Sequence, residues 1–368
     1  MWRLLADRYK DERIVAGYDL LNEPLPDWFS QYNDQMMPFY KEMTTSIREV
    51  DTRHMIILEG VHWATDWSIF TEKIDDNLML QFHKYWSNPD TESIFPYLEK
   101  SVEWNVPIFM GEGGENSKEW YSGAFQLFED HGISWNFWPW KKLDTRNSPC
   151  SIHMPSDWQL LVRYLEGENP PNPACAERIL WEYLDNLPLE PCTFHEDIVR
   201  SLFRRAPFRV PAVFYGYKGE GVSFGTASGG HSGSHPEFRE RDCTDIRYED
   251  SGDGLKQEFW HGKGKSAKRA FVQLAAGDWL AYDFTIGVRP VEKRPRAFAI
   301  RMKLCPVQEK TRVTVAVNSE SIGSVEVTGE EGVWQEVYLE TSSLQKPGRI
   351  HVVVKAEINP VRIEWIEI

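Results

Sequence analysis

The stretch Ile14-Val15-Ala16-Gly17-Tyr18-Asp19-Leu20-Leu21-Asn22-Glu23-Pro24 decides how the first part of this chain folds. It begins as a short apolar run with a β-branched start, which is typical of a buried parallel strand. Pro24 has no N–H to give to a strand ladder, so the strand ends in the polar pair Asn22 and Glu23. An ordinary exit from a strand into a loop, with a solvated Glu, explains an isolated Asn-Glu-Pro as well as a functional site does. Only the rest of the chain can distinguish an ordinary strand exit from a functional site.

Four further apolar runs follow at short intervals, at residues 55–60, 78–85, 106–113 and 133–138. Helical patterns separate them at 38–50, 94–104 and 118–130, and other helices are predicted at 2–12, 69–74 and 158–165. Strands that alternate with helices over short connections indicate a parallel sheet with crossover helices, hence an α/β fold.

The pattern changes after residue 166, where the Pro-rich segment 170–173 predicts a turn and two short helices are predicted at 176–187 and 195–205. Beyond residue 216 the helical period gives way to short alternating runs, which indicate an all-β sandwich. These runs are 279–284, 297–304, 312–317, 323–327, 334–339, 349–355 and 361–366. We therefore expect one domain over 1–200, a linker over 201–215 and an independently folding β-sandwich over 216–368.

Composition narrows the class of partner. A chain of 368 residues with 41% hydrophobic and 26% charged residues is typical of a soluble protein of two domains. The net charge of −15 argues against nucleic acid as a partner, because nucleic-acid binding needs basic surface. Neutral polymers are compatible with this charge, and the 16 Trp offer aromatic faces on which sugar rings stack.

The sequence shows neither a membrane-spanning segment nor a signal peptide. No apolar stretch is long enough to span a bilayer, and the first ten residues resemble an amphipathic helix rather than a signal peptide. Five scattered Cys form no zinc-binding spacing, and their odd number weakly favours a reducing compartment.

Chemistry-bearing side chains recur where the predicted strands end. Glu23 ends the first strand and Glu112 ends the fourth, where flanking glycines let a ligand approach the backbone. His83 and Tyr85 lie two apart on the third strand and so face the same side, and Trp138 ends the fifth. Each residue alone has a structural explanation, as a core or capping residue. Two carboxyl groups facing one pocket suit glycoside hydrolysis, in which one protonates the leaving oxygen and the other attacks or activates water.

In this order and spacing, Asn22-Glu23-Pro24, His83-Lys84-Tyr85, Gly111-Glu112 and Trp138 resemble the carboxyl-terminal part of glycoside hydrolase family 5. This cellulase family consists of retaining (β/α)8, or TIM, barrels. The resemblance covers about 1–165 and implies a partial barrel that contains strands 4–8, acts on a β-glycan polysaccharide or oligosaccharide, and needs no metal or cofactor for catalysis.

The resemblance also implies a role for each matching residue. Glu23 is the acid/base, Glu112 the nucleophile and Asn22 the contact to the sugar 2-hydroxyl. Tyr85 partners the nucleophile, His83 lies near the acid/base, and Trp138 is the platform under the reacting sugar, as the resemblance implies.

The departure from the family is as clear as the match. Strands 1–3 of the barrel, with the arginine and histidine that they contribute to the site, have no counterpart here. We therefore expect this chain alone to hydrolyse β-glucan poorly or not at all. The alternative is a carbohydrate-binding protein in which the incomplete barrel has lost catalysis. The habits of the family favour an extracellular location.

The second domain resembles carbohydrate-binding modules of the family 6 and 35 type, through segments 241–247, 276–282, 332–335 and 363–366. Such modules are β-sandwiches that often bind structural calcium, so the resemblance implies a calcium ion here. Asp242 and Asp245 are candidate ligands, although a solvated loop explains them as well. Trp279 and Trp334 are expected in the core, and Trp260 is the candidate for an exposed stacking site that binds sugar.

Overall fold

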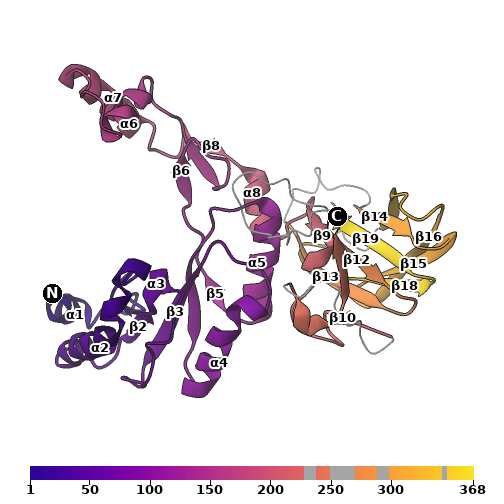
Figure 1. Cartoon of the computed structure of the whole chain (residues 1–368), viewed down its shortest axis with the longest axis horizontal. Coiled ribbons are helices and arrows are strands. Elements are labelled where there is room, and N and C mark those ends of the chain that lie inside the picture. The colour runs from indigo at the N-terminus through magenta and orange to yellow at the C-terminus, as the bar shows by residue number, and fades with distance from the viewer. Residues whose placement is uncertain (228–237, 249–269, 288–297, 342–345) are drawn as a thin grey trace.

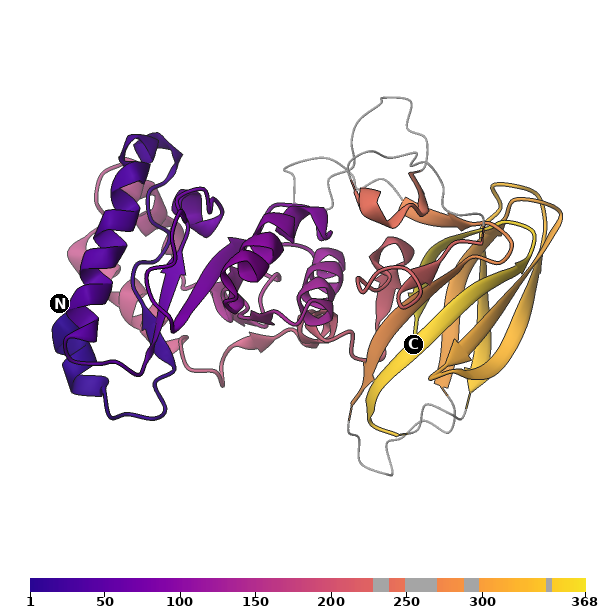
Figure 2. The same ribbon diagram turned by 90° about the horizontal axis from the view of Figure 1, so that it is seen from below.

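The computed structural model describes residues 1–227, 238–248, 270–287, 298–341 and 346–368. Two regions follow one another along the long axis of the molecule, and the C-terminus lies in the second (Figures 1 and 2). The first region contains a parallel sheet with helices, and the second contains two antiparallel sheets. In the described residues, no helix has the length and apolar character needed to cross a membrane.

The first region is built on five parallel strands in the order β1-β2-β3-β4-β5, which confirms the predicted α/β architecture. The strands are β1 (Gly17–Asp19), β2 (Met55–Glu59), β3 (Leu78–Lys84), β4 (Ile108–Gly113) and β5 (Ser134–Trp135). Helices α1 (Trp2–Tyr9), α2 (Asn33–Arg48), α4 (Phe95–Trp104) and α5 (Lys118–Asp130) alternate with them, and short 3-10 turns η1 (Asp27–Tyr32) and η2 (Glu92–Ile94) precede α2 and α4. Consecutive strands are neighbours because each crossover helix returns the chain to the adjacent position.

Two local predictions are wrong. The apolar start of the first predicted strand lies outside the sheet, and Ile14 is 95% exposed, because pairing begins only where Gly17 meets Met55. No helix forms over 69–74, where Ile69 and Phe70 enter the core from an irregular segment. A short helical turn, α3 (Val61–Ala64), directly follows β2 instead.

The two faces of the parallel sheet differ in character. On one face, apolar side chains of the strands pack against α2, α4 and α5 in one core that includes Ile56, Leu58, Leu80, Phe82 and Met110. The alternate positions of the same strands carry Asp19, Glu59, Gln81 and His83 to the opposite face. The period-two alternation therefore gathers polar groups on the face that the helices do not cover.

An excursion separates β5 from the last helix of this region. Strands β6 (Lys141–Leu143), β7 (Cys150–Ile152) and β8 (Thr193–Phe194) form a small sheet, and Figure 1 shows α6 (Trp158–Leu165) and α7 (Pro173–Asp185) projecting away from the parallel sheet. The chain then returns to the main core through α8 (Glu196–Leu202), which contributes Ile198 and Leu202 to it.

The second region confirms the predicted all-β pattern. One antiparallel sheet has the order β10 (Phe224–Gly225), β13 (Trp279–Ile286), β18 (Gly348–Ile358), β15 (Lys310–Val317) and β16 (Glu320–Thr328). The other has β11 (Asp245–Tyr248), β12 (Ala270–Leu274), β19 (Val361–Glu367), β14 (Phe298–Pro306) and β17 (Gln335–Thr341). Apolar residues from both sheets fill one core.

The segment predicted as a linker over 201–215 is largely part of this second region. Strand β9 (Arg209–Pro211) pairs with β19, and the turn η3 (Ala212–Phe214) lies in the sandwich core. Val210, Val213 and Phe214 are buried there because packing in the sandwich core removes their apolar surface from water. Its proline spacing predicts a linker, but its apolar residues decide where it packs.

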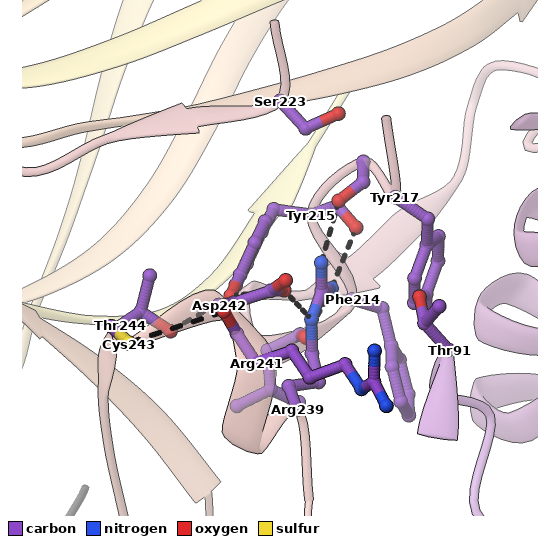
Figure 3. A network of polar contacts seen from close by, with 12 residues as sticks. Thr91, Phe214, Tyr215, Tyr217, Ser223, Arg239, Arg241, Asp242, Cys243 and Thr244 are labelled. Carbon is purple, nitrogen blue, oxygen red and sulfur yellow. Dashed lines mark hydrogen bonds and ion pairs between the residues drawn. The ribbon is translucent and has the colours of Figure 1, made fainter. Parts of the chain in front are cut away.

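A buried arginine organises the junction of the two regions (Figure 3). Arg239, which precedes the turn η4 (Glu240–Asp242), donates to the carbonyl oxygens of Val213 at 3.1 Å, Tyr215 at 2.8 Å and Gly216 at 2.6 Å. Its guanidinium lies 3.4 Å from the ring centroid of Tyr215. The planar donors of arginine thus hold backbone that forms no sheet ladder at this point.

Candidate active site

Three side chains singled out from the sequence meet at the carboxyl-terminal edge of the parallel sheet: Glu23 follows β1, and His83 and Glu112 lie near the ends of β3 and β4. The Nδ1 atom of His83 lies 2.7 Å from Oε1 of Glu23 and 3.6 Å from Oε2 of Glu112. One ligand atom from each of the three lies within 4.8 Å of the others. The two carboxylates therefore face one another across His83, with 27% of the Glu23 side chain and 17% of the Glu112 side chain exposed.

The backbone around Glu23 is held in an unusual conformation. Glu23 has φ of 44° and Leu25 has φ of 50°, both in the left-handed region that residues other than glycine seldom occupy. The N–H of Glu23 donates to Oε2 of Glu59 at 2.6 Å, and the carbonyl of Leu25 accepts from the N–H of His62 at 2.9 Å. Contacts from the end of β2 thus fix the loop that follows β1.

His83 is buried among three carboxylates. Its Nε2 lies 3.6 Å from Oε1 of Glu59, while Nδ1 faces Glu23 and Glu112. Burial alone would lower the pKa of His83, but hydrogen bonding to Glu59 and Glu23 and the charges of Glu59 and Glu112 outweigh it and raise the pKa. The imidazole is thereby favoured in its charged form, which donates from both ring nitrogens.

Glu112 accepts a hydrogen bond from Tyr85, the residue that the family resemblance pairs with it. The Tyr85 hydroxyl donates to Oε2 of Glu112 at 2.7 Å. Burial, followed by this hydrogen bond and the charge of Glu112, raises the pKa of Tyr85, so the phenol stays a donor. A shift in register between Phe82 and His83 sets His83 opposite Glu112, which brings both side chains to one place.

The glycines beside Glu112 make room for protein rather than leaving the backbone open. A Cβ on Gly111 would lie 2.2 Å from the Gln81 side chain, and a Cβ on Gly114 would lie 1.9 Å from the carbonyl oxygen of Trp138. The N–H of Trp138 also donates to the carbonyl of Gly113 at 2.9 Å. Trp138 is therefore anchored through its backbone while half of the residue, 50%, stays exposed.

For two other predicted site residues, Asn22 and Trp260, the described part of the chain establishes no role in the cluster. Asn22 is exposed next to Glu23. Trp260 lies outside the described residues. The roles that the family resemblance implies for these two residues stay predictions.

The structure adds polar neighbours that the sequence argument missed. Glu59, 0% exposed, accepts from the Glu23 N–H and from Nε2 of Gln81. Burial of the Asp19 carboxyl, followed by the nearby charge of Glu59, raises the pKa of Asp19 to about 7, although the residue as a whole is exposed along the edge strand β1. Glu59 ends the run Ile56-Ile57-Leu58 as Glu112 ends its own, so the signal that selects Glu23 and Glu112 applies to it equally.

The cluster carries negative charge with one imidazole. Among the described residues, no Lys or Arg nitrogen lies within ion-pair distance of Glu23, Glu59 or Glu112. Such a site stabilises positive charge that develops on a bound molecule. The three clustered side chains, Glu23, His83 and Glu112, also offer atoms that suit a divalent ion. The hydrogen bond between His83 and Glu23 and the one from Tyr85 to Glu112 already account for the arrangement.

The acidic residues nominated in the second region have cationic partners. Oδ2 of Asp242 accepts from Nε of Arg239 at 2.7 Å and from the Tyr215 hydroxyl at 2.9 Å (Figure 3). Asp245 accepts from both Nε and an outer nitrogen of Arg247, at 2.9 and 2.7 Å. Each carboxylate is thus engaged with arginine, and the calcium ion stays a prediction.

The two tryptophans expected in the core of the second region, Trp279 and Trp334, are partly buried, and the Trp334 ring contacts Phe271 at 5.4 Å between centroids. A cavity of about 430 Å³ opens beside Asp242 at the junction of the two regions. It lies apart from the strand-end cluster, because Glu23, His83 and Glu112 do not line it.

Comparison with known proteins bears on the first region. Residues 1–144 match the cellulase family, glycosyl hydrolase family 5. This segment contains β1–β5 and every strand-end residue described above. The family match ends before the second region, so its resemblance to carbohydrate-binding modules stays a prediction.

Individual relatives match in part. A β-xylosidase of Phanerodontia chrysosporium is 33% identical over 179 residues, which are 39% of this chain and 37% of the relative. An endoglycoceramidase of Hydra vulgaris is 32% identical over 106 residues, 24% of this chain and 20% of the relative. The structure of Thermotoga maritima Cel5A with cellobiose shares 18% identity over 55% of this chain and 64% of that chain, with a TM-score of 0.36. The chain thus spans well under half the length of these curated relatives, 37% of one and 20% of the other.

Proposed function

We propose that this chain carries the acid/base and the nucleophile of a retaining β-glycosidase of glycoside hydrolase family 5. The main support is that Glu23 and Glu112 both approach His83, with one atom from each of the three side chains within 4.8 Å of the others. Retaining glycosidases place their two carboxyl groups about 5–5.5 Å apart, whereas inverting enzymes need about 6.5–9.5 Å to admit a water. Carboxylate oxygens that approach within 4.8 Å leave little room for an intervening water, which supports direct attack by a carboxylate.

In the proposed reaction, an oxygen of Glu112 attacks the anomeric carbon as the bond to the leaving oxygen breaks. Glu23 gives its proton to that oxygen, then removes a proton from the water that releases the sugar from Glu112. His83 donates from Nδ1 to Oε1 of Glu23, so the second oxygen, Oε2, is the one that faces the leaving group. The Tyr85 hydroxyl holds Glu112 in position for attack.

The substrate is a β-glycan or another β-glycoside. The relatives are named for different glycosides, and the exposed face of Trp138 offers a platform to any β-linked pyranose. Asn22, beside the acid/base, is proposed to contact the sugar 2-hydroxyl. After β1 and β2, the exposed rings of Trp28 and Trp63 pack edge to face at 5.3 Å and offer further aromatic surface to a sugar.

We also propose that β1–β5 form strands 4–8 of a (β/α)8 barrel and that the second region is a jelly-roll carbohydrate-binding module. The alternative function is carbohydrate binding without catalysis. The exposure of Asp19 along β1 favours that alternative for the chain alone, because water has access beside the carboxyl groups.

The test measures hydrolysis and its stereochemistry together. We expect slow release of reducing sugar from β-glucan by this chain, faster release by a version extended with any upstream barrel strands that the gene encodes, and none by the Glu112→Gln form of either. Proton NMR of the first product should show the β-anomer, since two displacements retain configuration. An α-anomer as the first product would contradict the proposal. Binding of oligosaccharide with no turnover in either version would leave the carbohydrate-binding alternative.

A further inference from the structure

Glu59 is the one carboxylate of the described cluster that has no contact with solvent, at 0% exposure. It is the last residue of β2, and its side chain lies beneath Glu23 and His83 on the polar face of the sheet. Oε2 accepts from the Glu23 N–H at 2.6 Å, and Oε1 accepts from Nε2 of Gln81 and lies 3.6 Å from Nε2 of His83. Every one of these contacts points toward the proposed active site.

A buried carboxylate is usually paired with an arginine or lysine, whose opposite charge offsets the loss of hydration. In the part of the chain that the structure describes, Glu59 has no such partner within ion-pair distance. A backbone amide, an amide side chain and an imidazole face it, together with the carboxyl of Asp19, whose pKa is raised by burial, by the charge of Glu59 and by a hydrogen bond to it. Burial of a charge on these terms is costly for folding, so a role in stability alone explains it poorly.

The backbone that Glu59 binds is the strained one. Glu23 has φ of 44°, a conformation that persists in residues other than glycine only where the surroundings impose it. A hydrogen bond to a charged acceptor is about twice as strong as a neutral one, and the distance of 2.6 Å is short for such a bond. The carboxylate of Glu59 is therefore placed to hold this turn.

We propose that Glu59 is a positioning residue: it fixes the Glu23 backbone, and with it the direction in which the Glu23 carboxyl presents its proton. The inference rests on the proposed function, because it assumes that Glu23 is the acid. Gln81 and His83 complete the support, since both contact Glu59 and His83 contacts Glu23 as well. Without Glu59, the turn relaxes toward an ordinary backbone conformation and the carboxyl of Glu23 moves away from the leaving oxygen.

Kinetics with two leaving groups tests this role in the full chain. Phenyl β-cellobioside needs a proton on its leaving oxygen, whereas the 2,4-dinitrophenyl glycoside departs without one. We expect Glu59→Leu to lower kcat/KM about 100-fold for the phenyl glycoside, as misplaced catalytic groups do, and less than about fivefold for the dinitrophenyl glycoside. Glu59→Gln keeps an acceptor for the Glu23 N–H and should recover most of the loss.

Asp130 provides the matched control. It is a buried carboxylate that also accepts a backbone N–H, from Tyr217 at 2.8 Å, but it lies at the junction of the two regions. Asp130→Leu should lower thermal stability and change both rates by the same factor. An equal loss on both glycosides in Glu59→Leu would overturn the positioning role while leaving the proposed function intact.

A second measurement does not depend on turnover. The Glu23 amide proton, assigned by comparison with Glu23→Gln, should resonate far downfield in the wild-type chain and exchange slowly with solvent. In Glu59→Leu we expect an upfield shift and at least about tenfold faster exchange, with unchanged exchange in the core of β3. An unchanged Glu23 amide in Glu59→Leu would overturn the inference, whereas absence of hydrolysis in wild type with the expected amide response would count against the proposed function alone.

Discussion

Acidic side chains have different partners in the two regions of this molecule. In the parallel sheet, Glu23, Glu59 and Glu112 crowd around one histidine, and burial together with Glu59 raises the pKa of Asp19 to about 7. In the antiparallel region, Asp283 binds His351 and Arg349; burial would raise its pKa, but these partners lower it to about 2.

The difference separates carboxylates that hold the fold from carboxylates that are available for chemistry. An acid paired with arginine gains attraction that offsets the loss of hydration, so it stabilises the folded state and stays ionised. Acids that face one another without a lysine or arginine repel, and a protein keeps them together at a cost in stability. The sheet cluster is therefore the site to which we assign proton exchange with a substrate in the proposed function.

The largest effect is expected when the segment bound by Arg239 is removed from the second region. We expect the piece 206–368 to fold cooperatively and the piece 216–368 not to fold. The shorter piece loses β9, several buried apolar side chains and two carbonyl acceptors of Arg239. Each large apolar side chain lost from a core costs about 3–5 kcal/mol, so the sum approaches the whole stability of a domain.

Far-UV circular dichroism during thermal unfolding of both pieces measures this. A cooperative β-type transition in the 216–368 piece would show that the predicted boundary, rather than the packed segment, marks the start of a folding unit.

The next largest effect is expected from one acid in each region. Glu112→Gln should lower kcat on β-glucan by roughly 10³-fold or more, because a neutral amide cannot act as the nucleophile. Asp242→Asn should change kcat less than about threefold while lowering the unfolding temperature, since it removes the partner of a buried arginine. Steady-state kinetics and calorimetry on both variants check this. A comparable loss of kcat in Glu112→Gln and Asp242→Asn would contradict the assignment of chemistry to the acids of the parallel sheet alone.

A smaller effect is expected at the exposed platform. Trp138→Ala should lower kcat/KM about tenfold, equivalent to about 1.4 kcal/mol of lost aromatic contact with the sugar. Trp181 on α7, 59% exposed and outside the cluster, is the matched control, and its Ala variant should behave as wild type. Kinetics on β-glucan oligosaccharides measure both. Equal losses of kcat/KM in Trp138→Ala and Trp181→Ala would contradict a specific sugar contact at Trp138.

The smallest effect is a difference in pH dependence. Because the pKa of Asp19 is raised in the folded state, its contribution to stability is greatest below pH 3.8 and is lost as pH rises through about 7. The pKa of Asp283 is depressed, so its contribution is present above pH 3.8 and is lost as pH falls through about 2.

Urea unfolding from pH 2 to 8 compares the two acids. Asp19→Asn should flatten the decline of the free energy of unfolding between pH 4 and 7, and Asp283→Asn should flatten the decline toward pH 2. The same pH response in both variants would contradict the contrast between the regions.

Much of the fold and of the cluster follows from local sequence patterns. The period of the apolar residues predicts the five parallel strands and the main sandwich strands, because burial of one face of a strand depends on residues two positions apart. Polar residues directly after apolar runs identify Glu23, His83, Tyr85 and Glu112, because the carboxyl ends of parallel strands lie on one edge of the sheet.

Other features depend on contacts between segments that are distant in the sequence. Glu59 becomes a partner of the Glu23 backbone only through the pairing of β1 with β2, and His83 reaches Glu112 only through the register shift between β3 and β4. The segment 206–215 has proline spacing typical of a linker, yet its apolar side chains pack in the sandwich core and its strand β9 pairs with β19, near the far end of the chain.

Local patterns are enough to predict most of the strands and helices and the acids that follow them, because both depend on a few neighbouring residues. Tertiary contacts establish which acids share a histidine, which are bound by arginine and which one binds the backbone of another. Those partnerships depend on strand register and on positions within a few ångströms, and the free energy of a charge depends on the groups that immediately surround it.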